Sequence, residues 1–573
     1  MPVTWRVGRE RVWPPLLVFS LALALRVAHV LALRRSAYFV HPVLDAGTYH
    51  EAALALARGE GYPEAVFWQP PGYPFFLALV YAVAGPGFLV PRLVQAVLGA
   101  STAVVTYAVG ARVFGRTVGL LAGLGVAAYG TLIYYDGELL TPALGTLLEL
   151  VAVFLAVRAP AEPAPRPAWL AAGLFAGLAA LVTATTLVLV PVMAAFARRR
   201  AAWVLVGVVC AVAPATARNW IQGHQFVLVS SNAGINLFVG NNKHYDAMVG
   251  MRPGRDWQAL LRAPSHYGVR GAAAASGFFV RRVVLYARTD PAGFMLLQAR
   301  KLRLLLGGDE VLRNQEIYPV RADSPVLRVL LWKAPGLAFP FGLLLPAAVL
   351  GLVVGARRAP MLVAMVLVQA AAVVAFFVTA RYRAPLVPLL SVFAAEGLRW
   401  LGAATPRGRL AALGLVVPLY LLANLGQGAM PRRMNPDAEF GLATWLEREG
   451  RRVEALPLYE RVARENPTYW DAWERLSRAF RAEGRVDEAE AALRTARGIV
   501  PEFFDTLLIL GRIRDAEGQW RDAADYYRRA LAMEPDDPVA RAGLARALGR
   551  VEGGTGTGPP VDDGRGPHPG PTP

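Results

Sequence analysis

Repeated apolar segments of about twenty residues constrain the fold of this chain more than any other feature. The first runs from Trp13 to Leu33, and others recur as far as Leu425, separated by polar stretches. An apolar helix of about twenty residues is long enough to cross the hydrocarbon core of a bilayer. With 55% hydrophobic residues and a mean hydropathy of +0.37, these segments predict an all-α, polytopic membrane domain.

About eleven spans are expected, of which the shorter ones lie at the lower limit for crossing a bilayer. The first segment is too long for the core of a secretion signal, so we interpret it as a span. The short apolar stretch Tyr73–Ala84 is assigned to the first outer loop as a partly embedded helix. The expected spans are Trp13–Leu33, Arg92–Gly110, Thr117–Tyr135, Leu139–Val157, Trp169–Leu181, Thr186–Phe196, Ala201–Ala217, Leu331–Gly355, Met361–Val378, Pro385–Trp400 and Leu410–Leu425.

The net charge of +18 is distributed unevenly along the chain. Residues 1–430 hold 38 basic and 17 acidic residues, whereas residues 431–550 hold 21 basic and 22 acidic ones. The excess of basic over acidic residues therefore lies among the apolar segments. This distribution is typical of charges that orient a membrane protein and not of a nucleic-acid-binding surface. It predicts a cytoplasmic membrane protein with a cytoplasmic amino terminus, extracytoplasmic loops at 34–91 and 218–330, and everything after Gly426 outside. Cys210 is the only cysteine, so an intrachain disulfide is excluded.

A 34-residue repeat follows the membrane domain, which is expected to cover residues 1–430. Gly450, Gly484 and Gly518 mark the period, which predicts an α-solenoid of three tetratricopeptide repeats over residues 435–550. Such arrays bind proteins on a concave surface. The Gly/Pro-rich tail 551–573 is expected to be disordered.

The outer loop 218–330 is too long for a simple connection. Helices are expected around Gly277–Arg288 and Phe294–Leu306. Asn232 and Asn236 belong to a cluster of amide and hydroxyl groups that could contact sugar hydroxyls. Ordinary turns favour the same residue types, so turn chemistry is the alternative interpretation.

The first outer loop contains an acid followed by a helix signal. Thr48 and Glu51 have the spacing of a capping box, which predicts a short helix from Tyr49 to Arg58 just behind Asp45. The helix dipole would favour an ionised Asp45, so this carboxylate could act as a general base. The alternative is that Asp45 only caps the helix.

The order of several short motifs resembles the GT-C glycosyltransferases, in particular protein O-mannosyltransferases and the lipid A aminoarabinose transferase. The resemblance extends from about Trp13 to about Leu425. The motifs are Asp45 after the first span, Y-x-x-A from Tyr49, Gln69-Pro70-Pro71-Gly72-Tyr73, R-x-x-Q at Arg92–Gln95, and Phe114-Gly115-Arg116.

This resemblance implies an inverting transfer from a polyprenyl-phosphate-linked sugar at the extracytoplasmic face, with Asp45 as the base. It also implies a second acid that orients the acceptor or a metal, and Glu138 with its neighbour Asp136 occupies that place. A solvated helix start is the alternative for these two acids. The histidines show no metal-ligand spacing, so no cofactor is assigned, and a divalent metal is left open.

Other residues of the first loop are expected to line the substrate cavity. Gln69 stands where the mannosyltransferases have His, and Pro70 and Pro71 are expected to form a rigid, extended turn. The remaining cavity residues are Tyr49, His50 and Tyr73.

The departing lipid phosphate requires fixed cations, and Arg381 and Arg383 lie at the outer end of a late span. The nearby Pro385 favours an extended backbone, in which both guanidinium groups would point the same way. The alternative is interfacial snorkelling. Arg218 is a second phosphate candidate, and Arg26, inside the first span, ranks below these residues.

The leading hypothesis is a membrane glycosyltransferase whose acceptor is a glycan, a lipid or a protein. A protein partner is expected on the repeats. The competing hypothesis is a non-catalytic membrane scaffold that presents the repeats for complex assembly. A transporter is disfavoured because internal symmetry and paired charges within spans are not evident.

Overall fold

The computed structural model describes residues 13–34, 36–162, 164–251, 255–311, 317–426, 436–499, 504–535 and 537–553. Its contacts divide the chain into two compact units. The first comprises Met1–Arg252 and Val269–Ile499, and the second comprises Pro253–Gly268 and Val500–Pro573. The expected disordered tail falls almost entirely on residues 554–573, which lie outside the described residues.

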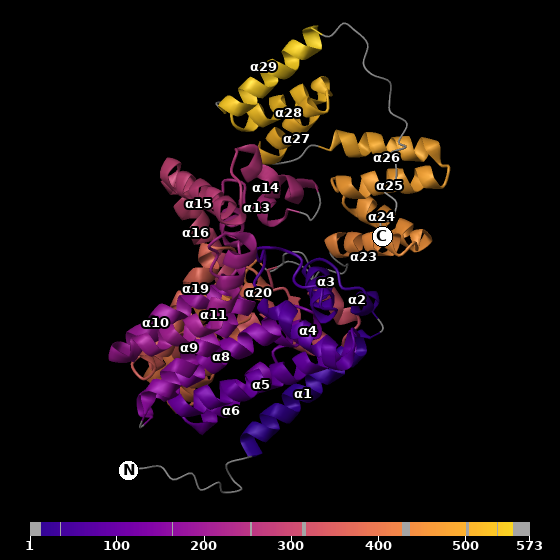
Figure 1. The fold of residues 1–573 in the computed structure, drawn as a ribbon. Coiled ribbons are helices and arrows are strands. Elements are labelled where there is room, and N and C mark those ends of the chain that lie inside the picture. The colour runs from indigo at the N-terminus through magenta and orange to yellow at the C-terminus, as the bar shows by residue number, and fades with distance from the viewer. Residues whose placement is uncertain are drawn as a thin grey trace. The chain divides into compact units, whose positions relative to one another are not determined.

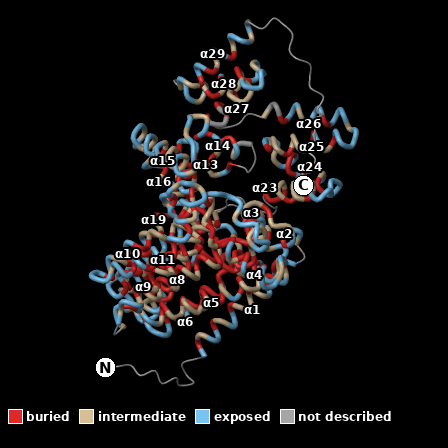
Figure 2. Tube along the Cα trace, in the orientation of Figure 1, coloured by how far each residue is buried: buried red, intermediate tan, exposed pale blue. Residues whose placement is uncertain are grey.

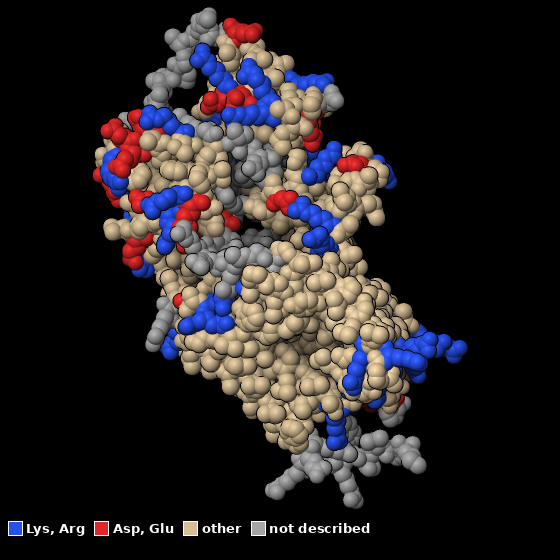
Figure 3. Space-filling model, turned by 180° about the vertical axis from the view of Figure 1, so that it is seen from behind, with Lys and Arg blue, Asp and Glu red and all other residues tan. Residues whose placement is uncertain are grey.

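The first unit contains the membrane helices, which pack side by side (Figure 1). Seven described helices are long and apolar enough to cross a membrane, or eight if one bent pair is counted as a span. The face of this helical body that Figure 3 shows is mostly uncharged, and basic side chains gather at its margins. One of these candidate spans, Ala184–Gly223, contains both α10 and α11, and shorter apolar helices pack beside the spans. All helices of this body are α1 (Trp13–Leu33), α5 (Leu89–Val113), α6 (Arg116–Ala127), α7 (Gly130–Gly137), α8 (Pro142–Arg158), α9 (Pro165–Val182), α10 (Leu189–Ala197), α11 (Ala201–Gly223), α18 (Phe341–Gly355), α19 (Pro360–Ala375), α21 (Leu386–Ala403) and α22 (Pro406–Asn424).

Two expected spans have a different form in the structure. The segment predicted as Thr117–Tyr135 is the bent pair α6 and α7, whose axes differ by 52°. The segment predicted as Leu331–Gly355 begins with a hairpin of β1 (Trp332–Ala334) and β2 (Leu337–Phe339), and only the remainder is helical. Gly336 has φ +81° and supplies the tight turn between the strands.

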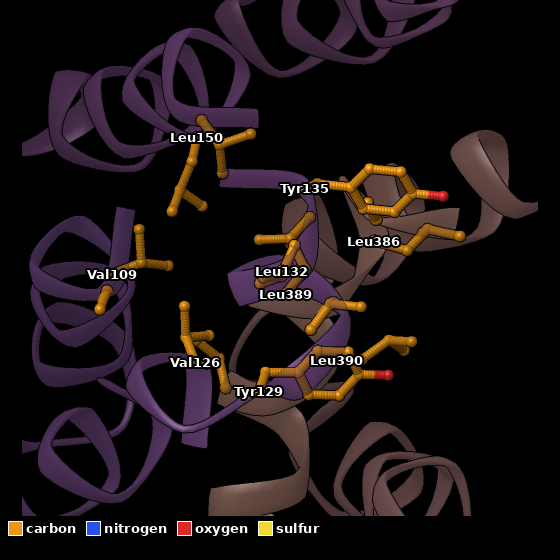
Figure 4. Close-up of a cluster of buried hydrophobic side chains, with 14 of the residues drawn as sticks. Val109, Val126, Tyr129, Leu132, Tyr135, Leu150, Leu386, Leu389 and Leu390 are labelled. Carbon is orange, nitrogen blue, oxygen red and sulfur yellow. The ribbon is translucent and has the colours of Figure 1, made fainter. Parts of the chain in front are cut away.

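Alanine and glycine bring the membrane helices into close contact. A side chain at Gly173 would meet the backbone of Val204 at 2.0 Å, which explains the tight packing of α9 on α11. Aliphatic and tyrosine side chains of α5 to α8 and α21 form one part of the interior (Figure 4), to which α1, α9, α18 and α19 also contribute. Buried residues are concentrated in these central helices (Figure 2).

Shorter elements cover one end of the membrane helices. The helices expected in the large loop are present as α15 and α16, and the apolar stretch Tyr73–Ala84 is helical as α4. The covering elements are α2 (Ala37–Val40), α3 (Asp45–Ala57), α4 (Gly72–Ala84), α12 (Ala233–Val239), α13 (Tyr245–Val249), α15 (Ala272–Thr289), α16 (Pro291–Leu306), α17 (Pro325–Leu330) and α20 (Ala380–Arg383); the short 3-10 helices are η2 (Ala159–Ala161), η3 (Ala184–Val188), η4 (Arg198–Arg200) and η5 (Tyr318–Ala322).

The repeat helices are divided between the two units. In the first unit they are α23 (Pro436–Arg448), α24 (Arg452–Glu465), α25 (Trp470–Ala482) and α26 (Val486–Gly498); in the second, α27 (Phe504–Ala516), α28 (Trp520–Met533) and α29 (Pro538–Gly553) pack with α14 (Arg255–His266). The periodic glycines have φ between +74° and +78° and terminate the first helix of each repeat.

Candidate functional site

Asp45 is the first residue of α3 and not a residue in front of it. The expected capping box is wrong, because α3 begins four residues earlier than predicted and the Thr48 hydroxyl donates back to the Leu44 carbonyl. Leu44 precedes the helix with φ +58°, a strained conformation for a branched side chain. Asp45 therefore lies in the first turn of α3, where the helix dipole stabilises a negative charge.

Arg381 of α20 approaches Asp45 across 336 positions of sequence. Its Nη1 donates to Asp45 Oδ2 at 2.5 Å, and its Nη2 donates to the Tyr49 hydroxyl at 2.9 Å and to Thr141 Oγ1 at 3.0 Å. The side chains of Arg381 and Asp45 are 22% and 31% exposed. Two of the predicted site residues thus form an ion pair that is reachable from outside.

Burial and charge shift the titration of this site. Burial raises the pKa of Tyr49 to about 12, so its hydroxyl remains protonated. Burial opposes the charge on Arg381, but Tyr49 and Asp45 hold its pKa above the ordinary value. The site therefore keeps a permanent positive charge beside a carboxylate.

A hydrogen-bonded network connects this pair with the second predicted acid. The rings of Tyr49 and Tyr73 meet edge to face, with centroids 5.2 Å apart. The Tyr73 hydroxyl donates to Gln95 Oε1 at 2.5 Å, and Gln95 Nε2 donates to the Glu138 carbonyl at 2.6 Å. Thr141, three residues after Glu138, accepts a hydrogen bond from Arg381 and so connects this network with the ion pair. The structure therefore places Asp45, Tyr49, Tyr73 and the Glu138 backbone around one region.

The Glu138 carboxyl is half-buried and forms no salt bridge with any described residue. Burial raises its pKa to about 7, and the positive charge of Arg92 partly opposes this shift. Glu138 is thus an acid that changes charge near neutral pH.

We expect Glu138→Gln to stabilise the protein at pH 8 but not at pH 4.5. The folded state holds the Glu138 proton up to about pH 7, whereas the unfolded chain releases it near its ordinary pKa of 4.5. The contribution of the Glu138 carboxyl to the free energy of unfolding therefore falls as the pH rises from about 4.5 to about 7. Thermal unfolding in detergent should show a midpoint gain of about 2 to 4 °C at pH 8. An equal gain at both pH values would contradict this expectation.

Asp136 is not available to an acceptor or a metal. It is buried and receives a hydrogen bond from Arg26 Nε at 2.6 Å, while Arg26 also donates to the carbonyls of Ala22 and Ala127. The bend between α6 and α7 directs Asp136 into the helix bundle, toward α1. The alternative of a solvated helix start is also wrong for Asp136, because Arg26 neutralises it inside the membrane domain.

Arg383 does not point toward Arg381. Residues 380–383 form one helical turn capped by Thr379, and not the extended segment that was expected. Arg383 is 2% exposed, pairs with Glu310 at 2.8 Å and donates to the carbonyls of Gly307 and Asp309. The prediction that both arginines point the same way is wrong, because positions two apart on a helix face roughly opposite sides.

Arg218 fixes the first outer loop in place. Its guanidinium donates to the carbonyls of Tyr62, Glu64 and Ala65, and it lies 4.2 Å from the centre of the Phe67 ring. These contacts hold the guanidinium on the loop backbone, so the structure favours a positioning role for Arg218 over the expected phosphate contact.

The remaining first-loop residues have distinct environments. His50 Nδ1 lies 2.8 Å from the Tyr81 hydroxyl, so it has a partner outside the Asp45 pair. Pro71 has helical backbone angles and precedes α4, so the double proline is not extended throughout. The Gln69 side-chain oxygen is buried without a hydrogen-bond partner among the described residues.

The amide cluster of the large loop lies beside Gln69. The Ser231 and Asn232 amides donate to the carbonyls of Phe67 and Trp68 at 2.9 and 3.2 Å. Asn232 then precedes α12, on which Asn236 is half-buried. The structure thus brings Asn232 to Trp68, the residue next to Gln69, from a separate loop. Gln69 in turn lies four residues before Tyr73 along the chain.

No group of three or more His, Cys, Asp or Glu side chains suited to a metal occurs in the part of the chain that the structure describes. Asp45 is engaged by Arg381, and Glu138 is a single carboxyl. These residues do not fit a multidentate divalent-metal site, and no chemical step is assigned to a metal.

The first repeat packs against the segment that leads into Asp45. His41 stacks on Trp445 with ring centroids 3.6 Å apart, and Val43 is buried in one cluster with Leu442. A side chain at Gly441 would meet Val43 Cβ at 3.1 Å. The repeat therefore supports the backbone just before α3.

Thr141 is a site residue that the sequence patterns do not predict, and for Gln95 and Arg92 they predict no role beyond their motif. Arg92 is buried and donates to the carbonyls of Phe39 and Gly137 at 2.9 and 2.7 Å. Thr141 directly precedes the proline that starts α8, which was the available signal for a polar group at a helix start.

The comparisons with known proteins agree with this architecture. A family model described as dolichyl-phosphate-mannose-protein mannosyltransferase matches residues 68–216. Two tetratricopeptide repeat models match residues 446–503 and 506–539. No curated protein sequence gives a significant match.

Similar solved structures include an oligosaccharyltransferase and ArnT. The Archaeoglobus fulgidus oligosaccharyltransferase AglB, in complex with an inhibitory peptide and a dolichol-phosphate, is 14% identical with a TM-score of 0.42, and the match covers 77% of this chain and 58% of that chain. ArnT from Cupriavidus metallidurans, bound to undecaprenyl phosphate, is 16% identical with a TM-score of 0.33, and the match covers 78% and 90%. This chain therefore spans less than two thirds of the length of the oligosaccharyltransferase.

The molecule is a multi-pass, all-α membrane protein with carboxyl-terminal tetratricopeptide repeats. The predicted resemblance to the GT-C glycosyltransferases is confirmed by the mannosyltransferase model, which matches residues 68–216. Asp45 and Arg381 lie outside that segment, so their roles rest on their geometry.

Proposed function

We propose that this protein transfers one monosaccharide from a polyprenyl-phosphate donor to an acceptor on the extracytoplasmic side, with inversion. The observation that carries the proposal is the partly exposed ion pair of Asp45 and Arg381 at the ends of the membrane helices. A base and a fixed cation in one place meet the two needs of such a reaction: removing a proton from the acceptor and stabilising the departing phosphate.

The ion pair also suggests how donor binding prepares the base. The lipid phosphate carries oxygens that can replace Asp45 as the partner of Arg381. Tyr49 and Thr141 would keep the guanidinium oriented during this exchange, since both already contact it. Asp45 would then be released as a free carboxylate beside the anomeric carbon.

In the transfer step, the acceptor hydroxyl gives its proton to Asp45 while its oxygen bonds to the anomeric carbon. The bond between that carbon and the phosphate oxygen breaks, and Arg381 retains the negative phosphate. Attack opposite to the leaving group inverts the anomeric centre. Gln69, Asn232 and Asn236 supply polar groups for sugar or acceptor hydroxyls.

A transfer assay tests the proposal. Purified protein in proteoliposomes would receive a panel of labelled polyprenyl-phosphate sugars together with lipid, glycan and protein acceptor fractions. We expect label to appear in one acceptor class from one donor. A non-catalytic scaffold would bind partners through its repeats and consume no donor in any combination.

We expect Trp445→Ala to lower turnover by about tenfold with little change in donor binding, because misplacing a catalytic group by a small distance is costly. The indole supports His41, four residues before Asp45. Trp473→Ala is the matched control, since its indole donates to Pro467 within the repeats. The measurement is kcat and KM for both variants. Equal losses in the two variants would contradict a specific role for Trp445.

A further inference from the structure

Glu149 is a buried acid within the membrane domain that the proposed reaction does not use. It lies on α8, in a candidate span, and its residue is 4% exposed. Thr186 Oγ1 donates to its Oε2 at 3.0 Å, and the Gln369 amide donates to its Oε1. No described basic side chain forms an ion pair with it. A bare carboxylate in apolar surroundings is costly and requires a proton or a cation.

Two further oxygens beside Glu149 lack partners. Gln369 Oε1 and Thr146 Oγ1 are buried without a hydrogen bond among the described residues, and their residues are 6% and 3% exposed. Thr146 precedes Glu149 by three positions on α8, so both side chains lie on one face. Buried Thr102 and Thr106 donate to the carbonyls four residues back, whereas Thr146 has no such bond. One proton on Glu149 would satisfy only one of these orphaned oxygens.

The backbone is also irregular at this position. Helix α9 ends at Val182, Thr186 lies in the 3-10 segment η3, and α10 begins at Leu189. This segment joins two candidate spans, Pro165–Val182 and Ala184–Gly223. Such non-helical backbone is tolerated next to apolar helices where it is buried in protein or lines a polar site. Two further elements therefore contact this carboxylate: η3 through the Thr186 hydroxyl and α19 through the Gln369 amide nitrogen.

We propose that Glu149, Thr146, Thr186 and Gln369 bind a monovalent cation, with Na⁺ the best fit. Rotating the Gln369 amide about its terminal bond exchanges its nitrogen and oxygen, and the four side chains then present oxygen ligands to the ion. Oxygen ligands suit a hard cation, and a single negative charge balances one positive charge. Transition metals favour nitrogen or sulfur ligands, which this cluster lacks. The bound ion would connect α8 with η3 and α19 through its ligands. Its site on α8 lies further along the helix than Thr141, which directly precedes α8.

The test is thermal unfolding of the purified, full-length protein in detergent, at constant ionic strength, in NaCl, KCl or N-methylglucamine chloride. We expect Na⁺ to raise the unfolding midpoint in a saturable manner, by about 3 °C or more at concentrations well above the dissociation constant. Glu149→Gln should remove the Na⁺ response, and Thr186→Val should shift it to higher Na⁺ concentration. Thr106→Val, which changes a buried threonine elsewhere, should retain it.

A midpoint that is identical in all three salts would overturn the proposal and assign a proton to Glu149. A Na⁺ response that is equal in Glu149→Gln and the unmodified protein would overturn it as well, because the ion would then bind elsewhere. If Glu149→Gln does not fold, binding of radioactive Na⁺ to the unmodified protein and to Thr186→Val decides. None of these measurements depends on sugar transfer, so they stand apart from the proposed function.

Discussion

Asp45→Asn is expected to reduce sugar transfer by about 10² to 10⁴-fold, the usual contribution of a general base. Asparagine has nearly the same shape and can still accept a hydrogen bond from Arg381, so the fold should be retained. It cannot take a proton from the acceptor. The measurement is the turnover of labelled donor by the purified variant in proteoliposomes.

The same variant should bind polyprenyl phosphate as well as the unmodified protein or more tightly. Asp45 holds Arg381 at 2.5 Å and competes with the lipid phosphate for it, whereas the asparagine side chain of the variant would compete without a charge. Glu51→Gln is the matched control, because Glu51 is an exposed acid on the same helix. Full turnover in Asp45→Asn, or equal losses in both variants, would contradict the role of Asp45 as base.

Arg381→Ala is expected to weaken donor binding by about 10 to 100-fold, corresponding to the loss of a charge-assisted hydrogen bond of about 1.5 to 3 kcal/mol. Turnover should also fall, because the departing phosphate loses its fixed cation. Arg381→Lys should restore little, since a single ammonium group cannot reach Asp45, Tyr49 and Thr141 in the same fork geometry. Titration with polyprenyl phosphate and steady-state kinetics measure the two effects.

Arg383→Ala supplies the contrast, because this arginine is buried against Glu310. Removing one partner of a buried ion pair costs about 3 to 5 kcal/mol, so this variant should lose thermal stability or expression. Arg381→Ala should remain folded. Donor affinity lost in a stable Arg383 variant and kept in Arg381→Ala would reverse the assignment of the two residues.

The helical membrane domain and the repeats were predictable because their signals are periodic and local. Trp13–Leu33 is a single helix with the expected ends, and the 34-residue spacing of Gly450, Gly484 and Gly518 coincides with the observed turns. The number of spans was less predictable. The bend before Gly130 and the hairpin around Gly336 are tertiary features inside apolar sequence, where hydropathy alone cannot separate a span from a broken segment.

The pairing of the site residues could not be predicted from local patterns. The spacing of Thr48 and Glu51 predicts a helix that begins at Tyr49, but α3 begins at Asp45. Val43, just before this helix, packs against the first repeat, which is a long-range contact that local spacing does not reveal. Glu310, the partner of Arg383, lies 73 positions away, and Thr141 lies 240 positions from Arg381. Long-range contacts of this kind decide which charged residue is free for chemistry and which one is structural.

The most direct test of the proposed function is the release of polyprenyl phosphate from labelled donors by the purified protein, measured together with label in the acceptor. Equal amounts of lipid phosphate released and sugar transferred are expected in the unmodified protein, and both products should fall by about 10² to 10⁴-fold in Asp45→Asn. Release and transfer that persist in Asp45→Asn would contradict the proposed base. Absence of both products with every donor, in protein that still binds partners through its repeats, would contradict the proposal that the molecule is a glycosyltransferase.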